Sequence, residues 1–338
     1  MEQKIECPFC EGIADLHKEP KEITYRKDVF KILAHFYKCN KCQEEFTTTE
    51  ADTISLTQVH NQYRERNNIP FSEEIAAIRQ KYELSASKMS EVLGLGANGY
   101  SNYENGEIPT PAYGNLISAV ADPYTFMNLL DKAKEHFSDN AFNKAKERVA
   151  YLIRTADQNN NLYTVLNIYN QANNFTGYRK PQPARIASLV TYYIQHSKPD
   201  FNDRLKLNKQ LFFTDFAHYK NYGTSITGLS YRAVKYGPVP ANYDNIYAYL
   251  ENEQLISSQF LKLPNGGARE TFLSEADFDK DLFTGQEKQT IEKVVHRFAD
   301  ISTWDIVELS HQEKAWKELE ANRELIGYQD YAFELTAL

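Results

Sequence analysis

The spacing of apolar residues predicts a β-rich beginning to the chain. The alternation in Ile23-Thr24-Tyr25 and in Phe30-Lys31-Ile32 is typical of strands, and Phe46-Thr47-Thr48-Thr49 predicts a closing strand. A polar stretch over 58–68 has helical character and leads away from this segment. We therefore expect a small strand-and-turn module over residues 1–56.

From residue 71 the apolar period becomes helical. Ile75, Ile78 and Tyr82 form one stripe, with Ser72 as the expected capping residue, and Ser85 is expected to cap the next helix. Glycine and proline positions end the segments that follow. The pattern predicts helices over 72–82, 85–93, 98–105 and 113–121, and helical structure over most of 123–172.

The last part of the chain mixes helices with a few strands. Gly177–Pro183 contains two prolines and a positive charge, and it is the best candidate for a linker. Gly237-Pro238-Val239-Pro240 predicts a rigid turn, and Asn265-Gly266-Gly267 predicts the turn of a β-hairpin over 255–273. We expect a strand at 231–234 and helices over 183–196, 203–222, 241–252, 285–298 and 302–321.

Length and composition limit the class of protein. The chain has 338 residues, enough for two or three domains. No stretch approaches the roughly 20 apolar residues of a membrane helix, and the start MEQKIECPFC lacks the apolar core of a signal peptide. We therefore expect a cytoplasmic protein without a membrane partner, in which paired cysteines act as ligands.

The net charge of −8 is unevenly distributed. Residues 71–130 carry 3 basic against 7 acidic side chains, whereas residues 131–180 carry 8 against 5. Residues 181–338 are again acidic, with 17 against 22. A protein that reads duplex DNA normally presents a basic face, so attraction to DNA would have to come from Lys81, Lys88 and the basic middle segment, or from dimerisation.

The four cysteines form two C-x2-C pairs, Cys7-Pro-Phe-Cys10 and Cys39-Asn-Lys-Cys42, with 28 residues between them. Two such pairs can surround one zinc ion at about 2.3 Å with a tetrahedron of thiolates. Four thiolates leave no open position, so the ion would hold the fold and not activate water. A single pair also suits a redox dithiol, but two pairs among strands favour one structural Zn²⁺. The nearby His17 and His35 are not needed as ligands.

Residues 72–108 have the spacing of a helix-turn-helix. The stretch Gly94-Leu-Gly-Ala-Asn98-Gly-Tyr-Ser101-Asn102-Tyr103-Glu104-Asn105-Gly106 resembles the recognition segment of the MqsA family of antitoxins and related repressors. In that family a zinc ribbon likewise precedes the helix-turn-helix. The resemblance covers about residues 5–130 and implies binding to operator DNA.

This resemblance assigns expected DNA contacts. Asn98 corresponds to the family's base-reading Asn, whose side chain can pair bidentately with adenine. The family commonly has Arg four residues later, where this chain has Asn102, so guanine readout is not implied there. Ser101 and Tyr103 are expected to contact phosphate. The alternative is that Tyr100 and Tyr103 are core residues.

Further motifs resemble the SocA-like antitoxin domain, also called Panacea. They occur in the order Leu205–Tyr219, Tyr222–Gly228, Tyr236–Pro240 and Leu309–Lys317, and Asn208 stands where the family often has Gln. The match covers about residues 183–320. It implies a domain that neutralises a toxin by direct contact, the toxin being encoded by a neighbouring gene. Our candidate toxin contacts are Lys206, Lys209, Phe213, Tyr231 and Tyr236.

An enzymatic role is not expected. Asp215 and His218 are three residues apart and could form a catalytic or metal-binding pair, but such residues more often form hydrogen bonds inside a core. The sequence contains no nucleophile motif, phosphate loop or H-E-x-x-H.

The sequence thus predicts a multidomain, mainly α fold with small β elements. Its parts are a zinc ribbon at 1–56, a helix-turn-helix at 70–130, a helical connector and linker at 131–180, and an α-rich α+β domain with a β-hairpin at 183–325.

The leading hypothesis is a homodimeric type II antitoxin that masks a toxin and represses its own operon. Zinc removal is then expected to unfold residues 1–56 and to leave neutralisation by residues 183–320 largely intact. The alternatives are a stand-alone transcriptional regulator with a C-terminal sensor or interaction domain, and an interaction scaffold that has lost DNA binding.

Overall fold

The computed structural model describes residues 1–166, 171–262 and 268–338. It divides into two compact units, one formed by Met1–Val59 with Val165–Leu338 and the other by His60–Thr164. Helices predominate and the sheets are small and antiparallel, which confirms the predicted fold class. None of the helices in the described ranges has the length and apolarity that crossing a membrane requires.

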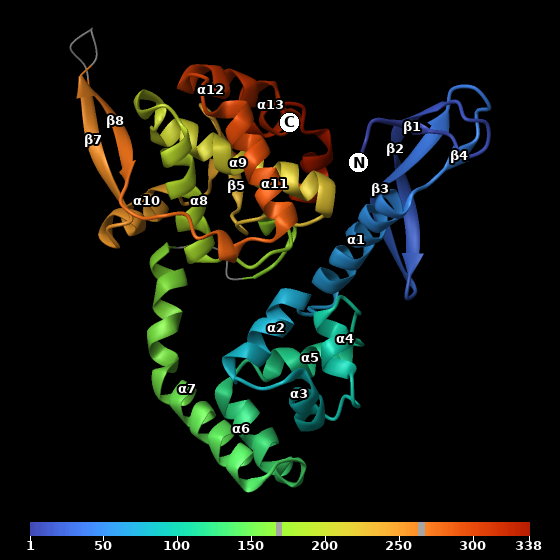
Figure 1. Cartoon of the computed structure of the whole chain (residues 1–338), viewed down its shortest axis with the longest axis vertical. Coiled ribbons are helices and arrows are strands. Elements are labelled where there is room, and N and C mark those ends of the chain that lie inside the picture. The colour runs from blue at the N-terminus through green and yellow to red at the C-terminus, as the bar shows by residue number, and fades with distance from the viewer. Residues whose placement is uncertain (167–170, 263–267) are drawn as a thin grey trace. The chain divides into compact units, whose positions relative to one another are not determined.

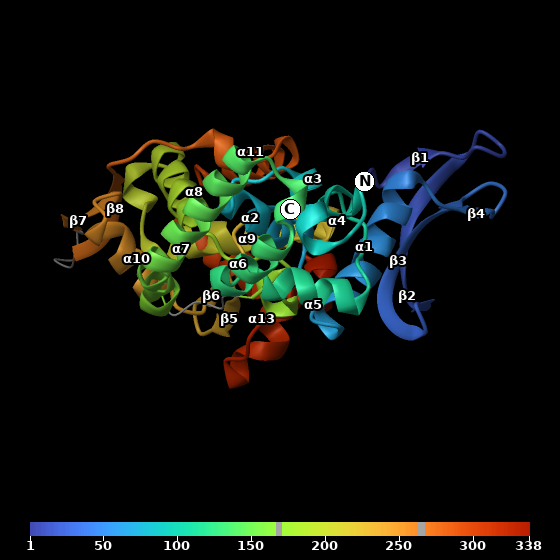
Figure 2. The same cartoon turned by 90° about the horizontal axis from the view of Figure 1, so that it is seen from below.

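The N-terminal ribbon is an antiparallel sheet in which four strands follow their chain order. Its strands are β1 (Lys4–Glu6), β2 (Ile13–Tyr25), β3 (Asp28–Cys39) and β4 (Glu45–Phe46). β2 and β3 pair from Ala14 opposite Cys39 to Tyr25 opposite Asp28, and Figures 1 and 2 show them as one long hairpin. Arg26 and Lys27 form its two-residue turn with positive φ angles of 49° and 77°.

The first helix begins earlier than predicted. β4 ends at Phe46 and α1 (Thr49–Arg66) begins at Thr49, so the predicted strand character of residues 47–49 was wrong. The hydroxyl of Thr48 accepts a hydrogen bond from the Ala51 N–H at 3.2 Å, and Glu50 and Asp52 lie in the first turn. A capping threonine followed by acids stabilises a helix start, and this outweighs the β propensity of the threonine run.

The second unit contains the predicted helix-turn-helix. Ser85 caps α3 as predicted, since its hydroxyl accepts from the Lys88 N–H at 3.2 Å. Ser72 does not cap α2, because the helix begins after Phe71, whose N–H donates to the Glu74 carboxylate at 2.8 Å. The elements of this unit are α2 (Ser72–Lys81), α3 (Ala86–Leu93), α4 (Gly99–Glu104), α5 (Pro111–Ala119), α6 (Pro123–Lys132), η1 (Lys134–His136) and α7 (Asp139–Leu166).

One hydrophobic core joins the helix-turn-helix to α6 and α7. Tyr82 stacks on Phe126 with ring centroids 3.9 Å apart, and Phe142 and Val149 of α7 are buried in the same cluster. Residues 139–152 were predicted to belong to a separate connector. Their apolar face packs against the helix-turn-helix instead, so this part of α7 belongs to the same folded unit.

The C-terminal domain is built around α9. Figure 1 shows α9 in contact with α8, α11 and α12, and its residues from Lys206 to Tyr219 are all buried. The helix predicted over 203–222 therefore has no solvent face over this stretch. The elements of the domain are η2 (Asn174–Thr176), α8 (Pro183–His196), η3 (Pro199–Phe201), α9 (Arg204–Tyr222), β5 (Tyr231–Val234), β6 (Gly237–Pro240), α10 (Tyr243–Asn252), β7 (Ile256–Lys262), β8 (Ala268–Ser274), η4 (Lys280–Leu282), α11 (Gly285–Phe298), α12 (Thr303–Gln312), α13 (Lys314–Leu319), η5 (Glu320–Asn322), α14 (Tyr328–Tyr331) and η6 (Ala332–Glu334).

The predicted linker at 177–183 is an integral part of this domain. The Gly177 carbonyl accepts from the Ser225 N–H at 2.9 Å, and Gly177 has a φ of 60°, at which a Cβ would lie 2.6 Å from the Ser225 side chain. Arg179 is 6% exposed and pairs with Glu287 at 2.9 Å. The positive charge that suggested a flexible linker thus belongs to a buried ion pair, and the linker prediction was wrong.

Two further predictions change at the end of the chain. Gly237–Pro240 is strand β6, paired with β5, and not only a turn. The predicted helix over 302–321 is interrupted at Glu313, which has extended backbone angles and accepts from the Thr336 and Ala337 N–H groups at 3.0 Å. Residues 326–338 are therefore held in the domain, which continues beyond residue 325. The hairpin over 255–273 is confirmed for β7 and β8, and its predicted turn Asn265–Gly267 lies outside the described residues.

The ribbon contacts this C-terminal segment. Lys18 donates to the Phe333 carbonyl at 3.4 Å, and the His35 ring lies 5.3 Å from the Phe333 ring. In α1, the Gln58 side chain accepts from Gln329 Nε2 at 2.8 Å. The ribbon is therefore packed within the larger unit and does not stand alone.

Candidate metal centre and nucleic-acid interface

The four cysteine sulfurs converge on one point. Their Sγ atoms all lie within 4.8 Å of one another, with Cys7 and Cys42 separated by 3.7 Å and Cys10 and Cys39 by 3.5 Å. A tetrahedral ion with metal–sulfur bonds of about 2.3 Å has edges of about 3.8 Å. All four are free thiols. The cluster predicted from the sequence is thus assembled in a geometry that fits one tetrahedral metal ion.

Two equivalent turns build this cluster. Cys7 donates its N–H to the Gly12 carbonyl at 2.7 Å, and Cys39 donates likewise to Glu44 at 3.0 Å. Each turn closes at the residue after its second cysteine, where Glu11 and Gln43 have positive φ angles of 56° and 63°. The repetition of one turn explains why the same C-x2-C spacing occurs twice, because each turn points two sulfurs the same way.

The surroundings of Cys39 favour a thiolate. The backbone N–H groups of Cys42 and Lys41 point at its sulfur, at 3.5 and 3.3 Å. These donors lower the pKa of Cys39 to about 6, so its sulfur is prepared to act as a metal ligand near neutral pH. Gly12 completes the enclosure, since a Cβ there would lie 3.2 Å from the sulfurs of both Cys10 and Cys39.

The two histidines near the cluster have other partners. The His17 ring stacks on Phe36 with centroids 5.7 Å apart. His35 is 1% exposed, its Nδ1 lies 2.9 Å from the Leu33 carbonyl, and burial lowers its pKa to about 4. Neither imidazole belongs to the sulfur cluster.

The predicted DNA contacts divide into exposed and buried residues. Asn98, which precedes α4, and Asn102, within it, are exposed, and Ser101 is partly exposed. Tyr103 is only 8% exposed and Tyr100 is fully buried. Tyr103 was expected to contact phosphate, and its burial contradicts that expectation because its ring fills the core of the helix-turn-helix.

The buried tyrosine Tyr100 fixes α4 in place. Its N–H donates to the Ser90 hydroxyl at 2.9 Å, and its own hydroxyl donates to the Ile75 carbonyl at 2.7 Å. α4 is thereby bonded to both α2 and α3, with Asn98 and Asn102 left on the surface. A short helix anchored in this way can present two amide side chains in a defined geometry.

Basic residues from α7 gather beside α3. A hollow of about 170 Å³ is lined in part by Lys88, Lys144 and Arg148. Lys88 pairs with Glu91 at 2.6 Å and Arg148 with Glu83 at 3.2 Å, so part of this charge is balanced locally. The sequence indicated that the segment after the helix-turn-helix is basic, but it could not place these residues next to Lys88.

Four of the five candidate toxin contacts are buried. Lys206 donates to the carbonyls of Ala299 at 2.9 Å and Ile301 at 2.8 Å, and burial lowers its pKa to about 8. Lys209 is 0% exposed and donates to the Pro238 carbonyl at 2.9 Å, and burial lowers its pKa to about 7.

Phe213 and Tyr231 lie in the aromatic core, each 0% exposed. The prediction that these four residues contact a partner is wrong for the structure, because α9 and β5 are covered. Of the five candidate toxin contacts, only Tyr236 is exposed, at 44%.

Asp215 and His218 do not form the pair that their spacing allows. Asp215 accepts from the N–H groups of Ile226 and Thr227 at 2.8 Å each, and from the Tyr231 hydroxyl at 2.8 Å. His218 Nδ1 lies 3.1 Å from the Thr290 hydroxyl. The two side chains serve separate contacts inside the core.

Comparison with known proteins gives two non-overlapping matches. Residues 5–124 match the family described as the antitoxin component of a bacterial toxin-antitoxin system, MqsA, and residues 207–317 match the SocA-like antitoxin, Panacea domain. Antitoxin MqsA of Escherichia coli (strain K12) is 29% identical over 121 residues, which are 34% of this chain and 92% of that protein.

The matches occur in the order that the sequence motifs indicated, with the sulfur cluster and the helix-turn-helix inside the first. Both families are antitoxin families. The chain therefore joins an MqsA-like ribbon and helix-turn-helix to a SocA-like Panacea domain in one polypeptide.

Proposed function

We propose that this chain is the antitoxin of a toxin–antitoxin pair, which neutralises a toxin encoded by a neighbouring gene through direct contact with its C-terminal domain. The observation that carries the proposal is the presence of two antitoxin families in succession along one chain.

Purification of the full chain together with the product of each neighbouring gene tests this role. A stable complex with a product that is toxic when expressed alone is the expected result. If the chain binds its own operator but no neighbouring product, the stand-alone regulator replaces the antitoxin as the better account.

We assign one structural Zn²⁺ to Cys7, Cys10, Cys39 and Cys42. The closely spaced sulfurs and the N–H groups directed at Cys39 support this assignment. When bound, the ion supplies cross-linking of the two turns and no open coordination position. It would thus hold the ribbon in shape without taking part in chemistry.

We also propose that the helix-turn-helix, in a homodimer, binds the operator of the chain's own operon. Replacing Asn98 by alanine is expected to weaken operator binding by about tenfold, since one bidentate amide contact to a base is worth about 1–3 kcal/mol. Asn128, exposed on α6, provides a matched Asn→Ala control that should change nothing. Both variants are compared with wild type by gel shift at one salt concentration, because phosphate contacts make affinity salt-dependent. Equal binding by all three proteins would remove Asn98 from the interface.

A further inference from the structure

The C-terminal domain exposes an aromatic pair. Trp304, in the first turn of α12, is 60% exposed, and Tyr236, between β5 and β6, is 44% exposed. Their rings lie edge to face, with centroids 6.2 Å apart at 70°. Tryptophan and tyrosine are the residues that most often dominate the energetics of protein interfaces.

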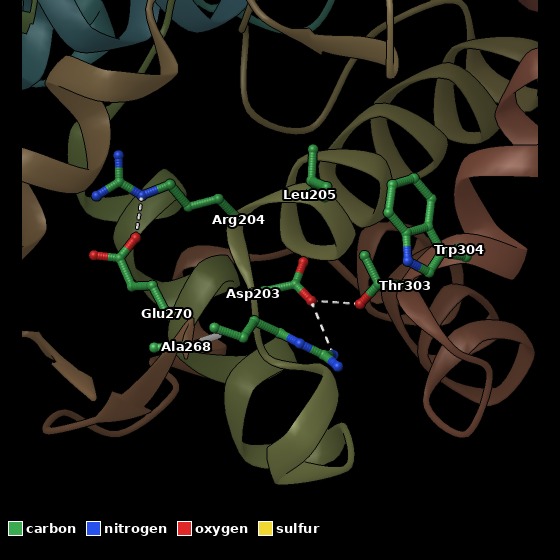
Figure 3. A pocket seen from close by; sticks show the side chains of 8 residues that line it. Asp203, Arg204, Leu205, Ala268, Glu270, Thr303 and Trp304 are labelled. Carbon is green, nitrogen blue, oxygen red and sulfur yellow. Dashed lines mark hydrogen bonds and ion pairs between the residues drawn. The ribbon is translucent and has the colours of Figure 1, made fainter. Parts of the chain in front are cut away.

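A cavity of about 380 Å³ adjoins Trp304. Figure 3 shows Trp304 and the Arg204–Glu270 pair on opposite sides of Asp203, which accepts a hydrogen bond from the Thr303 hydroxyl. Arg204 Nε lies 3.0 Å from Glu270. The cavity thus has an aromatic edge and walls of charged side chains that are already paired. A side chain of a partner can enter this cavity without breaking an ion pair, so no charged group of the cavity loses its partner.

The aromatic pair rests on a rigid support. Lys206 bonds α9 to the turn between α11 and α12, immediately before Trp304. Lys209 bonds α9 to Pro238 of β6, next to Tyr236, and Trp316 of α13 donates to the Val234 carbonyl at 2.8 Å. Surfaces whose side chains are fixed before binding lose less entropy on association. Lys206 and Lys209 therefore hold the backbone next to Trp304 and Tyr236 in place.

Charge indicates the chemistry of the partner. Asp305 and Glu308 are exposed on the same helix as Trp304, whereas the exposed Asp244 is already paired with Arg204 at 3.1 Å. Lys235 lies 5.4 Å from the centre of the Tyr236 ring, so one aromatic face of the pair already carries a cation. Exposed carboxylates one and four residues after Trp304 on the same helix are complementary to lysine and arginine, which pair with carboxylates and bind ring faces.

We propose that Trp304, Tyr236 and the adjoining cavity form the docking surface for a basic segment of the toxin. This inference rests on the proposed antitoxin function and specifies where the contact is made. A second copy of this chain is the competing occupant, and the experiment below separates the two.

The test compares three full-length proteins binding to the toxic neighbouring product by calorimetry. Trp304→Ala is expected to weaken binding by about 30-fold or more, the range of an interface hot spot. Tyr124→Ala is the matched control, because Tyr124 is a 62% exposed aromatic residue on α6, in the helix-turn-helix unit, and should bind within about twofold of wild type. Because Trp304 is exposed, its truncation should leave the melting temperature unchanged.

Charge reversal provides an independent readout. Glu308→Lys is expected to weaken the complex, and added salt should weaken the wild-type complex more than it weakens that of this variant. Wild-type affinity in Trp304→Ala would overturn the inference and leave the antitoxin function intact. Loss of self-association alone would assign the surface to a second copy and also overturn it. Failure of wild type to bind any toxic neighbour would contradict the proposed function itself.

Discussion

Replacing Cys39 by serine is expected to release the zinc ion and unfold β1–β4. Cys39 is fully buried at the centre of the cluster and its sulfur receives two backbone N–H groups. Structural zinc contributes about 10–16 kcal/mol of apparent binding free energy in small zinc modules, far more than a four-stranded ribbon can replace. Metal analysis of the purified protein should give one zinc per wild-type chain and none in the variant.

His17→Ala is the matched control, because His17 lies on β2 close to the cluster yet stacks on Phe36. It should retain one zinc. Gly12→Ala is expected to give an intermediate result, since its added methyl group would crowd two of the sulfurs without removing a ligand. Retention of zinc by the Cys39 variant would contradict the four-sulfur assignment.

The ribbon contacts change what zinc removal should do elsewhere. The expectation from sequence was a purely local effect. Because Lys18 and His35 contact Phe333, loss of the ribbon would also uncover part of the C-terminal segment. We therefore expect chelation to lower the melting temperature of the C-terminal domain somewhat, while neutralisation through the Trp304 surface persists.

Asp215→Ala is expected to lower the free energy of unfolding of the C-terminal domain by about 4 kcal/mol. The Asp215 carboxylate is fully buried and accepts from two backbone N–H groups and the Tyr231 hydroxyl, as well as from the Thr227 hydroxyl. Each buried donor left without an acceptor costs about 1–3 kcal/mol. Urea unfolding followed by tryptophan fluorescence measures the loss.

Asp215→Asn is the informative comparison. The amide keeps one acceptor oxygen for the Ile226 and Thr227 N–H groups, and the hydroxyl of Tyr231 can rotate to accept from the new NH₂ group. We expect about half of the alanine effect. Equal stability of wild type and Asp215→Ala would show that this carboxylate does not hold the segment from Ile226 to Tyr231.

Local sequence signals predicted the cysteine cluster and most helices. The C-x2-C spacing determines how two sulfurs can face one ion, so the cluster of Cys7, Cys10, Cys39 and Cys42 followed from the sequence. Ser85 was also a reliable cap, whereas Ser72 was not, because Glu74 reaches back to the Phe71 N–H. Which of two adjacent residues precedes the helix depends on which side chain can reach a free backbone N–H group. The sequence pattern does not show this.

Long-range contacts explain what the sequence did not predict. Gly177–Pro183 resembles a linker in composition, but Glu287, more than one hundred residues later, pairs with Arg179. Lys206 and Lys209 of α9 were candidate partner contacts, yet both donate to carbonyl groups of distant elements. Because these lysines are buried, the candidate partner surface is the exposed region at Trp304 and not α9. No sequence motif had indicated Trp304.

Growth rescue distinguishes direct neutralisation of the toxin from repression of its gene. The full chain and the neighbouring toxic gene are expressed from two unrelated promoters, so that operator binding cannot reduce the amount of toxin. If the full chain neutralises the toxin directly, the toxic gene alone will arrest growth and the full chain will restore it. Persistent arrest despite equal levels of both proteins would contradict direct neutralisation.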